Sequence, residues 1–137
     1  ESSLIAFKRG DILFGAMRPY FHKVLLAPFD GLTRTTCFVV NAREPFYRLF
    51  LYMLMFQKST VDYASTVAVG STMPYDRWKD LSRMNIVTPD LATIERFNII
   101  ISPIVNRITE NYEINQNLTR QRDLLLPRLM SGKLEVK

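Results

Sequence analysis

The last third of the chain carries an apolar pattern that is typical of one long helix. From position 94 to position 125, ten residues follow one another at alternating steps of three and four: Ile94, Phe97, Ile101, Ile104, Ile108, Asn111, Asn115, Leu118, Arg122 and Leu125. Such steps place side chains on one face of an α-helix. Seven of the ten are apolar, and burying each contributes about 1.5–3 kcal/mol before entropy is counted. The pattern therefore predicts a helix over 91–132 whose apolar seam lies along another helix.

The expected length of this helix bears on where its partner comes from. A helix of about 35 residues is about 50 Å long, whereas the other residues, about 90 of them, form a globule only about 25 Å across. We therefore expect a partner helix from a longer parent protein or from another chain. The chain opens at Glu1 in strand-like sequence, and we expect it to be a fragment of a larger protein.

Two irregularities in the helix leave alternatives open. Asn111 and Asn115 occupy seam positions, where they either fix register and partner choice or are solvated. Pro103 either kinks a nearly continuous helix, which the unbroken seam favours, or forms with Ser102 the start of a second helix. Helix-ending signals follow at Pro127 and Ser131–Gly132, and a strand-like tail is expected over 133–137.

Composition limits the class of protein. The 137 residues are 47% hydrophobic and 12% aromatic, which is enough for a hydrophobic core in one domain with an appendage. The net charge of +5 permits nucleic-acid binding without requiring it. No block of Lys and Arg occurs, and no apolar run is long enough to span a membrane. The single Cys37 excludes an internal disulfide and fits a reducing, cytoplasmic compartment.

The first 56 residues alternate strand and turn signals before a helix. Apolar and β-branched runs predict strands at 12–14, 24–27 and 35–40, in an antiparallel or mixed sheet. Glu44–Pro45 opens a predicted helix that continues to Phe56 and is apolar nearly all round, so it is expected to pack on the sheet. The predicted fold class is α+β.

The next segment has weaker signals. We expect helical turns over 58–64 and 75–81, a loop over 66–74 and a strand over 84–87 before Pro89. Asp90 is a predicted N-cap of the long helix. The predicted domains are a recognition domain over 1–90, the long helix over 91–132 and a tail over 133–137.

Catalytic signatures are absent from the sequence. One histidine and one cysteine cannot form a His/Cys metal cluster, and no glycine-rich phosphate loop or Gly-x-Ser-x-Gly motif occurs. Glu135-Val136-Lys137 has an acid-x-Lys spacing found in nucleases, but at a terminus it is not expected to be catalytic. We therefore expect neither enzyme activity nor a cofactor.

Three polar loops are candidates for contact with nucleic acid. The first combines two cations, a histidine and two aromatic residues within 18–23, and its cations could contact phosphates or a guanine edge. The alternative to DNA contact is that its aromatic residues belong to the core and its cations are solvated at the edge of the core. The others lie at 34–36 and 70–77 and offer hydroxyl and backbone donors to phosphates. The candidate DNA-binding residues are Arg18, Tyr20, His22, Lys23, Arg34, Thr35, Ser71, Tyr75 and Arg77.

Taken in order, several segments resemble the specificity subunit of type I restriction-modification enzymes. They are Gly10–Phe14, Arg18–Tyr20, Lys23–Val24, Gly31, Phe38–Val40, Gly70–Pro74, Ile86–Pro89, Leu118 and the closing run Arg-Asp-Leu-Leu-Leu-Pro-Arg-Leu-Met-Ser-Gly at 122–132. Their order and spacing carry the resemblance, which covers nearly the whole chain. The Glu-Gln pair usual near the start of the family's helix is replaced by Thr93–Arg96.

The resemblance implies a non-catalytic role in reading DNA. Such subunits carry two target-recognition domains, each followed by a long helix, and the two helices pack antiparallel and dock the methyltransferase subunits. Each recognition domain reads half of a split double-stranded target, and the restriction subunit joins through the methyltransferase. This chain would be the later part of one recognition domain with its helix, paired with the other half or with a second copy. The helix-interface residues are then Ile94, Phe97, Ile101, Ile104, Ile108, Leu118 and Leu125.

Two other classes of protein remain as alternatives. One is an interaction module that pairs through its long helix and does not bind DNA. The other is a fragment of a nuclease or methyltransferase, which requires a carboxylate cluster or a cofactor loop.

Overall fold

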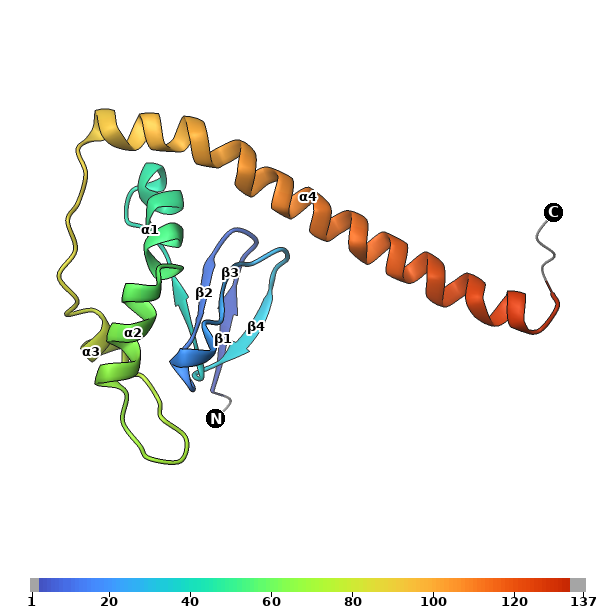
Figure 1. Ribbon diagram of the computed structural model, residues 1–137, viewed down its shortest axis with the longest axis horizontal. Coiled ribbons are helices and arrows are strands. Elements are labelled where there is room, and N and C mark those ends of the chain that lie inside the picture. Colours follow the sequence, from blue (N-terminus) through green and yellow to red (C-terminus); the bar gives the residue numbers. More distant parts are fainter. Residues whose placement is uncertain (1–2, 134–137) are drawn as a thin grey trace. The chain divides into compact units, whose positions relative to one another are not determined.

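The computed structural model describes residues 3–133 (Figure 1). The elements in chain order are β1 (Leu4–Phe7), β2 (Ile12–Gly15), the 3-10 helix η1 (Pro19–Phe21), β3 (Val24–Leu26), β4 (Gly31–Arg34), β5 (Cys37–Val40), the 3-10 helix η2 (Pro45–Tyr47), α1 (Arg48–Met55), α2 (Lys58–Val67), α3 (Trp78–Leu81) and α4 (Leu91–Met130). The chain divides into two compact units, Glu1–Ile101 and Ser102–Lys137.

The strands of the first unit form two small antiparallel sheets. One pairs β1 with β4, and the other has the order β3-β2-β5, so that Ile12 in the central strand lies opposite both Leu26 and Val40. The expected α+β class is confirmed, and of the two sheet types left open the antiparallel one forms. Gly31 in β4 lies opposite Phe7, and a Cβ there would come within 2.7 Å of the Phe7 ring, so a side chain at this position would displace that buried ring.

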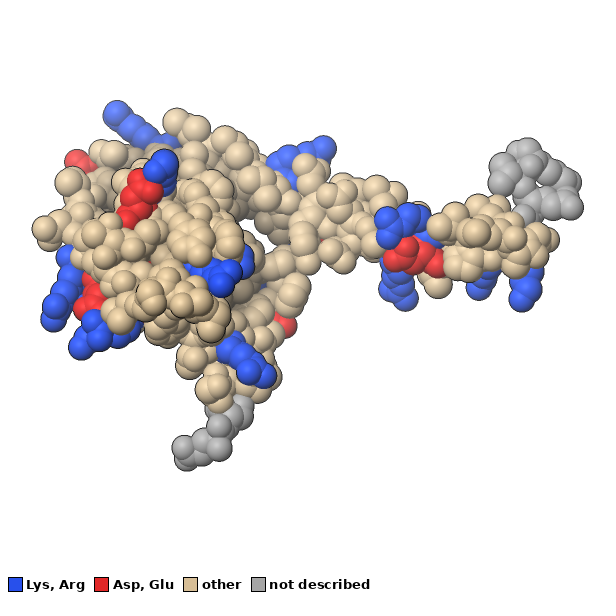
Figure 2. Space-filling model, turned by 60° about the horizontal axis from the view of Figure 1, so that its bottom comes forward, with Lys and Arg blue, Asp and Glu red and all other residues tan. Residues whose placement is uncertain are grey.

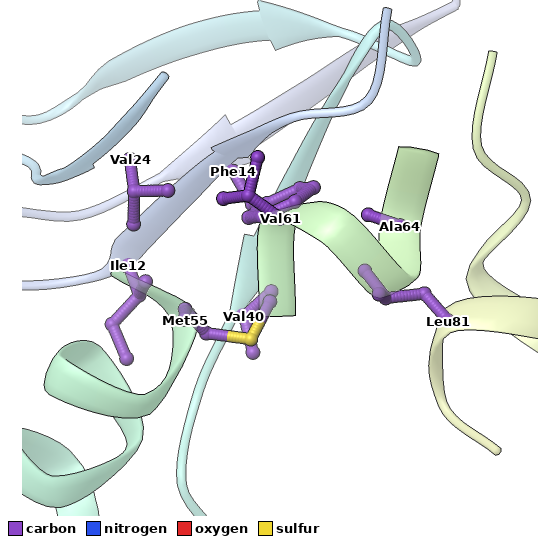
Figure 3. Packing of buried hydrophobic residues seen from close by; sticks show 8 residues of the cluster. All are labelled: Ile12, Phe14, Val24, Val40, Met55, Val61, Ala64 and Leu81. Atoms are coloured by element: carbon purple, nitrogen blue, oxygen red, sulfur yellow. The ribbon is translucent and has the colours of Figure 1, made fainter. Parts of the chain in front are cut away.

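The core of the first unit lies between the three-stranded sheet and the helices that follow it. Alternate residues of β2, Ile12 and Phe14, are 0% and 1% exposed, as expected where one face of a strand is covered. Figure 3 shows the buried cluster, to which three strands and three helices contribute: Ile12, Phe14, Val24, Val40, Met55, Val61, Ala64 and Leu81. This packing holds the loops at the ends of β2 in place.

The helices between the sheet and α4 occur in the order predicted from the sequence, but some begin or end at other residues than predicted. The predicted helix over 44–56 forms as η2 followed by α1, and the turn expected over 58–64 forms as the longer α2. The helix expected over 75–81 begins only at Trp78, because Tyr75 forms β-bridges with Met17 and Val69.

One strand expected from the sequence does not form, and one strand that forms was not expected. The strand expected over 84–87 does not form, and Val87 is 89% exposed. Conversely, β4 was missed, because the apolar residue Leu32 stands alone among polar neighbours and the strand exists through its hydrogen bonds to β1. The strand expected over 35–40 forms only from Cys37, since Thr35–Thr36 is the turn that links β4 to β5.

The start of α4 is capped as the sequence predicted. A carboxylate oxygen of Asp90 accepts a hydrogen bond from the backbone N–H of Thr93 at 2.7 Å. Hydrogen bonds from the side chain and the backbone of Thr93 lower the pKa of this carboxyl group. Asp90 therefore stays ionised at the helix N-terminus, where negative charge is favourable.

The long helix is continuous past both of its prolines. Of the two arrangements open at Pro103, the structure has one unbroken helix, and α4 continues beyond Pro127 to Met130. It ends where Gly132 adopts φ +68°, with Gly132 N–H donating to Leu129 and Lys133 N–H to Arg128. Of the predicted tail over 133–137, residues 134–137 lie outside the described residues. Within 3–133, no helix is both long and apolar enough to cross a membrane.

Candidate nucleic-acid interface

The segment that leaves β2 brings together loops that are far apart in the sequence. The N–H of Arg18 donates to the carbonyl of Pro74 at 2.8 Å, and the N–H of Asp76 donates to the carbonyl of Ala16 at 2.8 Å. Residues 16–18 thus lie beside residues 74–76, in an antiparallel arrangement centred on the bridge between Met17 and Tyr75.

The turn between β4 and β5 joins the same cluster. The N–H of Ala16 donates to the carbonyl of Thr36 at 2.9 Å, and the hydroxyl of Tyr75 donates to the carbonyl of Thr35 at 3.0 Å. All three candidate loops, at 18–23, 34–36 and 70–77, are therefore in hydrogen-bonded contact with one central segment.

An open groove of about 620 Å³ lies along this cluster. Its charged lining residues are Arg18 and Lys23. Its aromatic and sulfur-containing lining residues are Met17, Phe21, Cys37 and Met73. No acidic residue is among the lining residues in the part of the chain that the structure describes. A groove whose fixed charges are both positive is complementary to a phosphate backbone.

The two cations of the groove lie against one aromatic ring. Lys23 Nζ is 5.1 Å from the centroid of the Phe21 ring, and Arg18 Cζ is 6.0 Å from it. Such cation–π contacts restrict a cation without neutralising its charge. The Nε of Arg18 is buried and has no hydrogen-bond partner among the described residues. Arg18 is therefore held in place while its charge is not paired by an acid.

Two predicted residues of this region have contacts within the protein. His22 Nε2 donates to the carbonyl of Phe56 at 2.7 Å, and its ring lies 4.9 Å from the Phe56 ring. Tyr75 is half-buried and donates to Thr35 as described. Both side chains hold the loops together, and a direct contact of either with DNA stays a prediction.

The remaining predicted residues lie outside the groove lining. Arg34, Thr35 and Ser71 are exposed, and Tyr20 is 53% exposed beside Phe21. Arg77 is paired with Asp80, with 2.6 Å between Arg77 Nε and Asp80 Oδ2. The structure thus brings Arg18 and Lys23 into one groove and does not bring Arg34 or Arg77 there.

Sequence reasoning missed several residues of the groove. Met17 and Met73 line it although neither carries a polar signal, and Cys37 was read only as an indicator of redox environment. Burial raises the pKa of the Cys37 thiol, which therefore remains in its neutral form. Met17 belongs to the site through its bridge to Tyr75 and Cys37 through its pairing with Gly15, and the sequence reveals neither pairing.

Asp76 is a buried carboxylate in the segment that is hydrogen-bonded to residues 16–18. It is 0% exposed, and neither of its oxygens has a hydrogen-bond partner among the described residues. Burial raises its pKa to about 6. The sequence did not indicate that Asp76 is buried, because a charged residue in a polar loop is expected to be exposed.

The first unit uses the start of α4 for its own packing. Ile94 is 0% exposed, Phe97 meets the Phe50 ring edge-on at 6.3 Å, and the side-chain N–H of Asn98 donates to the carbonyl of Phe46 at 2.8 Å. The hydroxyl of Tyr47 also donates to the carbonyl of Pro89 at 2.8 Å. Ile101, the last predicted interface residue of this unit, is half-buried.

The second unit leaves the later part of the predicted seam in solvent. The exposed fractions of Ile104, Ile108, Leu118 and Leu125 are 53%, 57%, 55% and 46%. Neighbouring Leu124, Leu126 and Leu129 are exposed as well. An apolar helix surface of this kind is typical of an interaction site.

On the face that Figure 2 shows, basic residues do not gather into a single patch. Figure 2 shows Lys and Arg as separate groups over the visible face of the first unit, some of them beside acidic residues. The positive groove is thus a local feature of Arg18 and Lys23, and the overall charge of +5 does not by itself define a binding face.

Comparison with known proteins gives a consistent result. No protein-family model matches the sequence. The type I restriction enzyme EcoDI specificity subunit of Escherichia coli is 28% identical over 123 residues, which cover 90% of this chain and 26% of that protein. The MjaIX specificity subunit of Methanocaldococcus jannaschii is 28% identical over 141 residues, covering 100% of this chain and 30% of that protein.

A third relative agrees with these two. The HindI specificity subunit of Haemophilus influenzae is 30% identical over 121 residues, covering 82% of this chain and 26% of that protein. The chain thus spans 26–30% of the length of the curated relatives it matches. The resemblance seen in the sequence is confirmed: this chain matches part of a type I restriction enzyme specificity subunit.

Proposed function

We propose that this chain recognises DNA as part of the specificity subunit of a type I restriction-modification system. The observation that carries the proposal is the groove in which three separate loops meet and whose charged lining residues, Arg18 and Lys23, are both cationic. Its position in a chain similar to specificity subunits over most of its length supports the same role.

In this proposal the chain is a non-catalytic component without a cofactor. Residues 1–90 belong to a domain that reads one half of a bipartite double-stranded target, with base contacts giving specificity and phosphate contacts giving register. The helix over 91–132 acts as the spacer that pairs with the other half of the subunit or with a second copy. Methyltransferase subunits dock on the assembly, the restriction subunit joins through them, and the complex acts in the cytoplasm.

Replacing Arg18 with alanine tests the groove. We expect Arg18→Ala to weaken specific DNA binding by about 1–3 kcal/mol if Arg18 reads a base, with relaxed preference at that base pair. Lys23→Ala should instead weaken binding to all sequences and lower the slope of log K against log salt by about 1. The measurement is fluorescence anisotropy on duplexes enriched by this chain from a random library.

A variant of equal charge change outside the groove is the control. Arg83 is exposed and does not line the groove, so Arg83→Ala removes one positive charge without changing the site. If Arg18→Ala and Lys23→Ala leave affinity and salt slope at the values of Arg83→Ala, the groove does not bind DNA.

Replacing Ile108 with aspartate tests the helix. Because Ile108 is 57% exposed within the second unit, Ile108→Asp should leave the first unit folded and abolish pairing through the seam. Capture of methyltransferase subunits from lysate of the source cell by the tagged chain should then be lost. Asn106→Asp introduces the same charge on another face of the helix and should behave as wild type.

The exposed seam also favours a second candidate function, an interaction module that pairs through its helix and does not bind DNA. This alternative predicts association that responds to Ile108→Asp but no DNA binding with the salt dependence of phosphate contacts. Recovery of only the chain itself in the capture experiment, together with no enrichment of any duplex, would favour it.

A further inference from the structure

The short helix η1 is bracketed by two residues in an unfavourable backbone conformation. Arg18 has φ 52° and ψ 64°, and His22 has φ 53° and ψ 49°, both in the left-handed region. They are the only residues other than glycine with positive φ among those that the structure describes. Residues with a side chain adopt this region infrequently, and such strain is retained where the surrounding structure enforces it.

The surrounding structure does enforce it. Pro19 is almost fully buried, and the N–H of His22 donates to the Pro19 carbonyl at 2.8 Å. The His22 ring is fixed by its hydrogen bond to Phe56, and the carbonyl of Lys23 accepts a 2.8 Å hydrogen bond from Gly15. The two ends of the turn are thus anchored to the core unit.

Two aromatic side chains of η1 are exposed to solvent. Tyr20 and Phe21, which we call the aromatic tip, are 53% and 52% exposed, and their ring centroids are 4.9 Å apart. A folded chain gains nothing by straining its backbone to expose two aromatic rings, so this arrangement indicates a binding surface.

The charges around the aromatic tip indicate the chemistry of its partner. Arg18 and Lys23 both lie against the Phe21 ring, and the adjoining groove has no acidic lining residue among those described. A partner must therefore offer flat apolar surface close to negative charge. Exposed base faces beside phosphates have this chemistry, whereas an acidic protein surface lacks the flat apolar surface between its charges.

We propose that the aromatic tip is a wedge that packs against bases at an unstacked step of duplex DNA, with Arg18 and Lys23 on the flanking phosphates. The inference rests on the proposed DNA-recognition function and adds deformation of the DNA to it. Wedges of this kind offset the cost of unstacking by packing apolar side chains against the opened step. Because that cost depends on the sequence being opened, the wedge would contribute specificity without hydrogen bonds to bases.

A mismatched duplex tests the wedge without knowledge of the target. The full 137-residue chain is titrated against one 25-bp duplex of fixed sequence, fully paired or with a single central T·T mismatch. A mismatch already weakens stacking, so a wedge should bind the mismatched duplex about tenfold more tightly. In Tyr20→Ala/Phe21→Ala this ratio should fall to about one. Tyr20→Ala alone keeps the Phe21 ring against Arg18 and Lys23, so it should lower the ratio at an unchanged salt slope.

Controls separate this inference from the proposed function. Both tip residues are more than half exposed, so the single variants Tyr20→Ala and Phe21→Ala are expected to fold, and each should lower the ratio. Phe29→Ala removes another exposed ring, 55% exposed, and should keep the wild-type ratio. Binding of both duplexes with equal affinity by wild type, or an unchanged ratio in the double variant, would overturn the wedge alone. Failure of wild type to bind either duplex would overturn the DNA-recognition role, and the wedge with it.

Discussion

Replacing Phe14 with alanine is expected to lower the free energy of unfolding of the first unit by about 3–5 kcal/mol. Phe14 is 1% exposed at the centre of the three-stranded sheet, and its ring lies parallel to that of Phe38 at a centroid distance of 6.4 Å. Phe38 in turn meets Trp78 edge-on at 5.6 Å. Removing Phe14 leaves a cavity between the sheet and the helices packed on it, and the rings of Phe38 and Trp78 cannot fill this cavity by a small shift.

The effect is measured by urea unfolding followed by far-UV circular dichroism. Leu32→Ala is the matched control on another strand, because Leu32 is 64% exposed, and it should cost less than about 1 kcal/mol. Since Phe14 belongs to the strand that leads into the groove, Phe14→Ala should also weaken DNA binding through loss of folded protein. Equal stability of the two variants would mean that the core does not lie where Figure 3 shows it.

Local signals in the sequence were enough for the elements that depend on few contacts. The apolar run Ile12–Phe14 formed a buried strand, and Asp90 caps α4 through a residue three positions away. The end of α4 at Ser131–Gly132 follows from the freedom of glycine to adopt positive φ. Each of these features is decided within one or two turns of chain.

Features that depend on distant partners were not predictable. β4 exists because β1 pairs with it across 24 to 30 positions, from Phe7↔Gly31 to Leu4↔Arg34, whereas residues 84–87 are more apolar and have no strand partner. A strand is stabilised by hydrogen bonds between strands, and a single sequence does not show which segments provide them.

In the candidate site, too, local features were predictable from the sequence and features that depend on distant partners were not. The sequence identified all three loops by their polar and basic residues, but the Met17–Tyr75 bridge that joins them was invisible in it. This bridge selects Arg18 and Lys23 for the groove and leaves Arg77 paired with Asp80 outside it. Phe21 lies in one of the predicted loops. The sequence did not show that its ring lies against both cations, because this arrangement depends on the left-handed backbone conformation of Arg18 and His22 on either side of η1.

Asp76 should make the first unit less stable as the pH rises from 4 to 7. Its pKa is raised by burial to about 6, so the folded state holds the proton more tightly than the unfolded state. The stability that this proton provides is complete below the pKa of the unfolded chain, about 3.9, and is lost as the pH rises through the folded pKa. Integrated over both pKa values, the loss is about 3 kcal/mol.

Comparison with Asp76→Asn isolates this effect, because asparagine has nearly the same shape and does not ionise. The difference in unfolding free energy between variant and wild type should grow by about 2 kcal/mol between pH 4 and pH 7 in urea titrations, in favour of the variant. A constant difference across this range would mean that Asp76 finds a partner for its charge. One candidate is Arg18, because its segment 16–18 is hydrogen-bonded to residues 74–76 and its Nε is also buried and without a partner among the residues described. In that case the carboxylate and the guanidinium would form an ion pair, and Asp76→Asn would then weaken DNA binding by releasing Arg18 from its position.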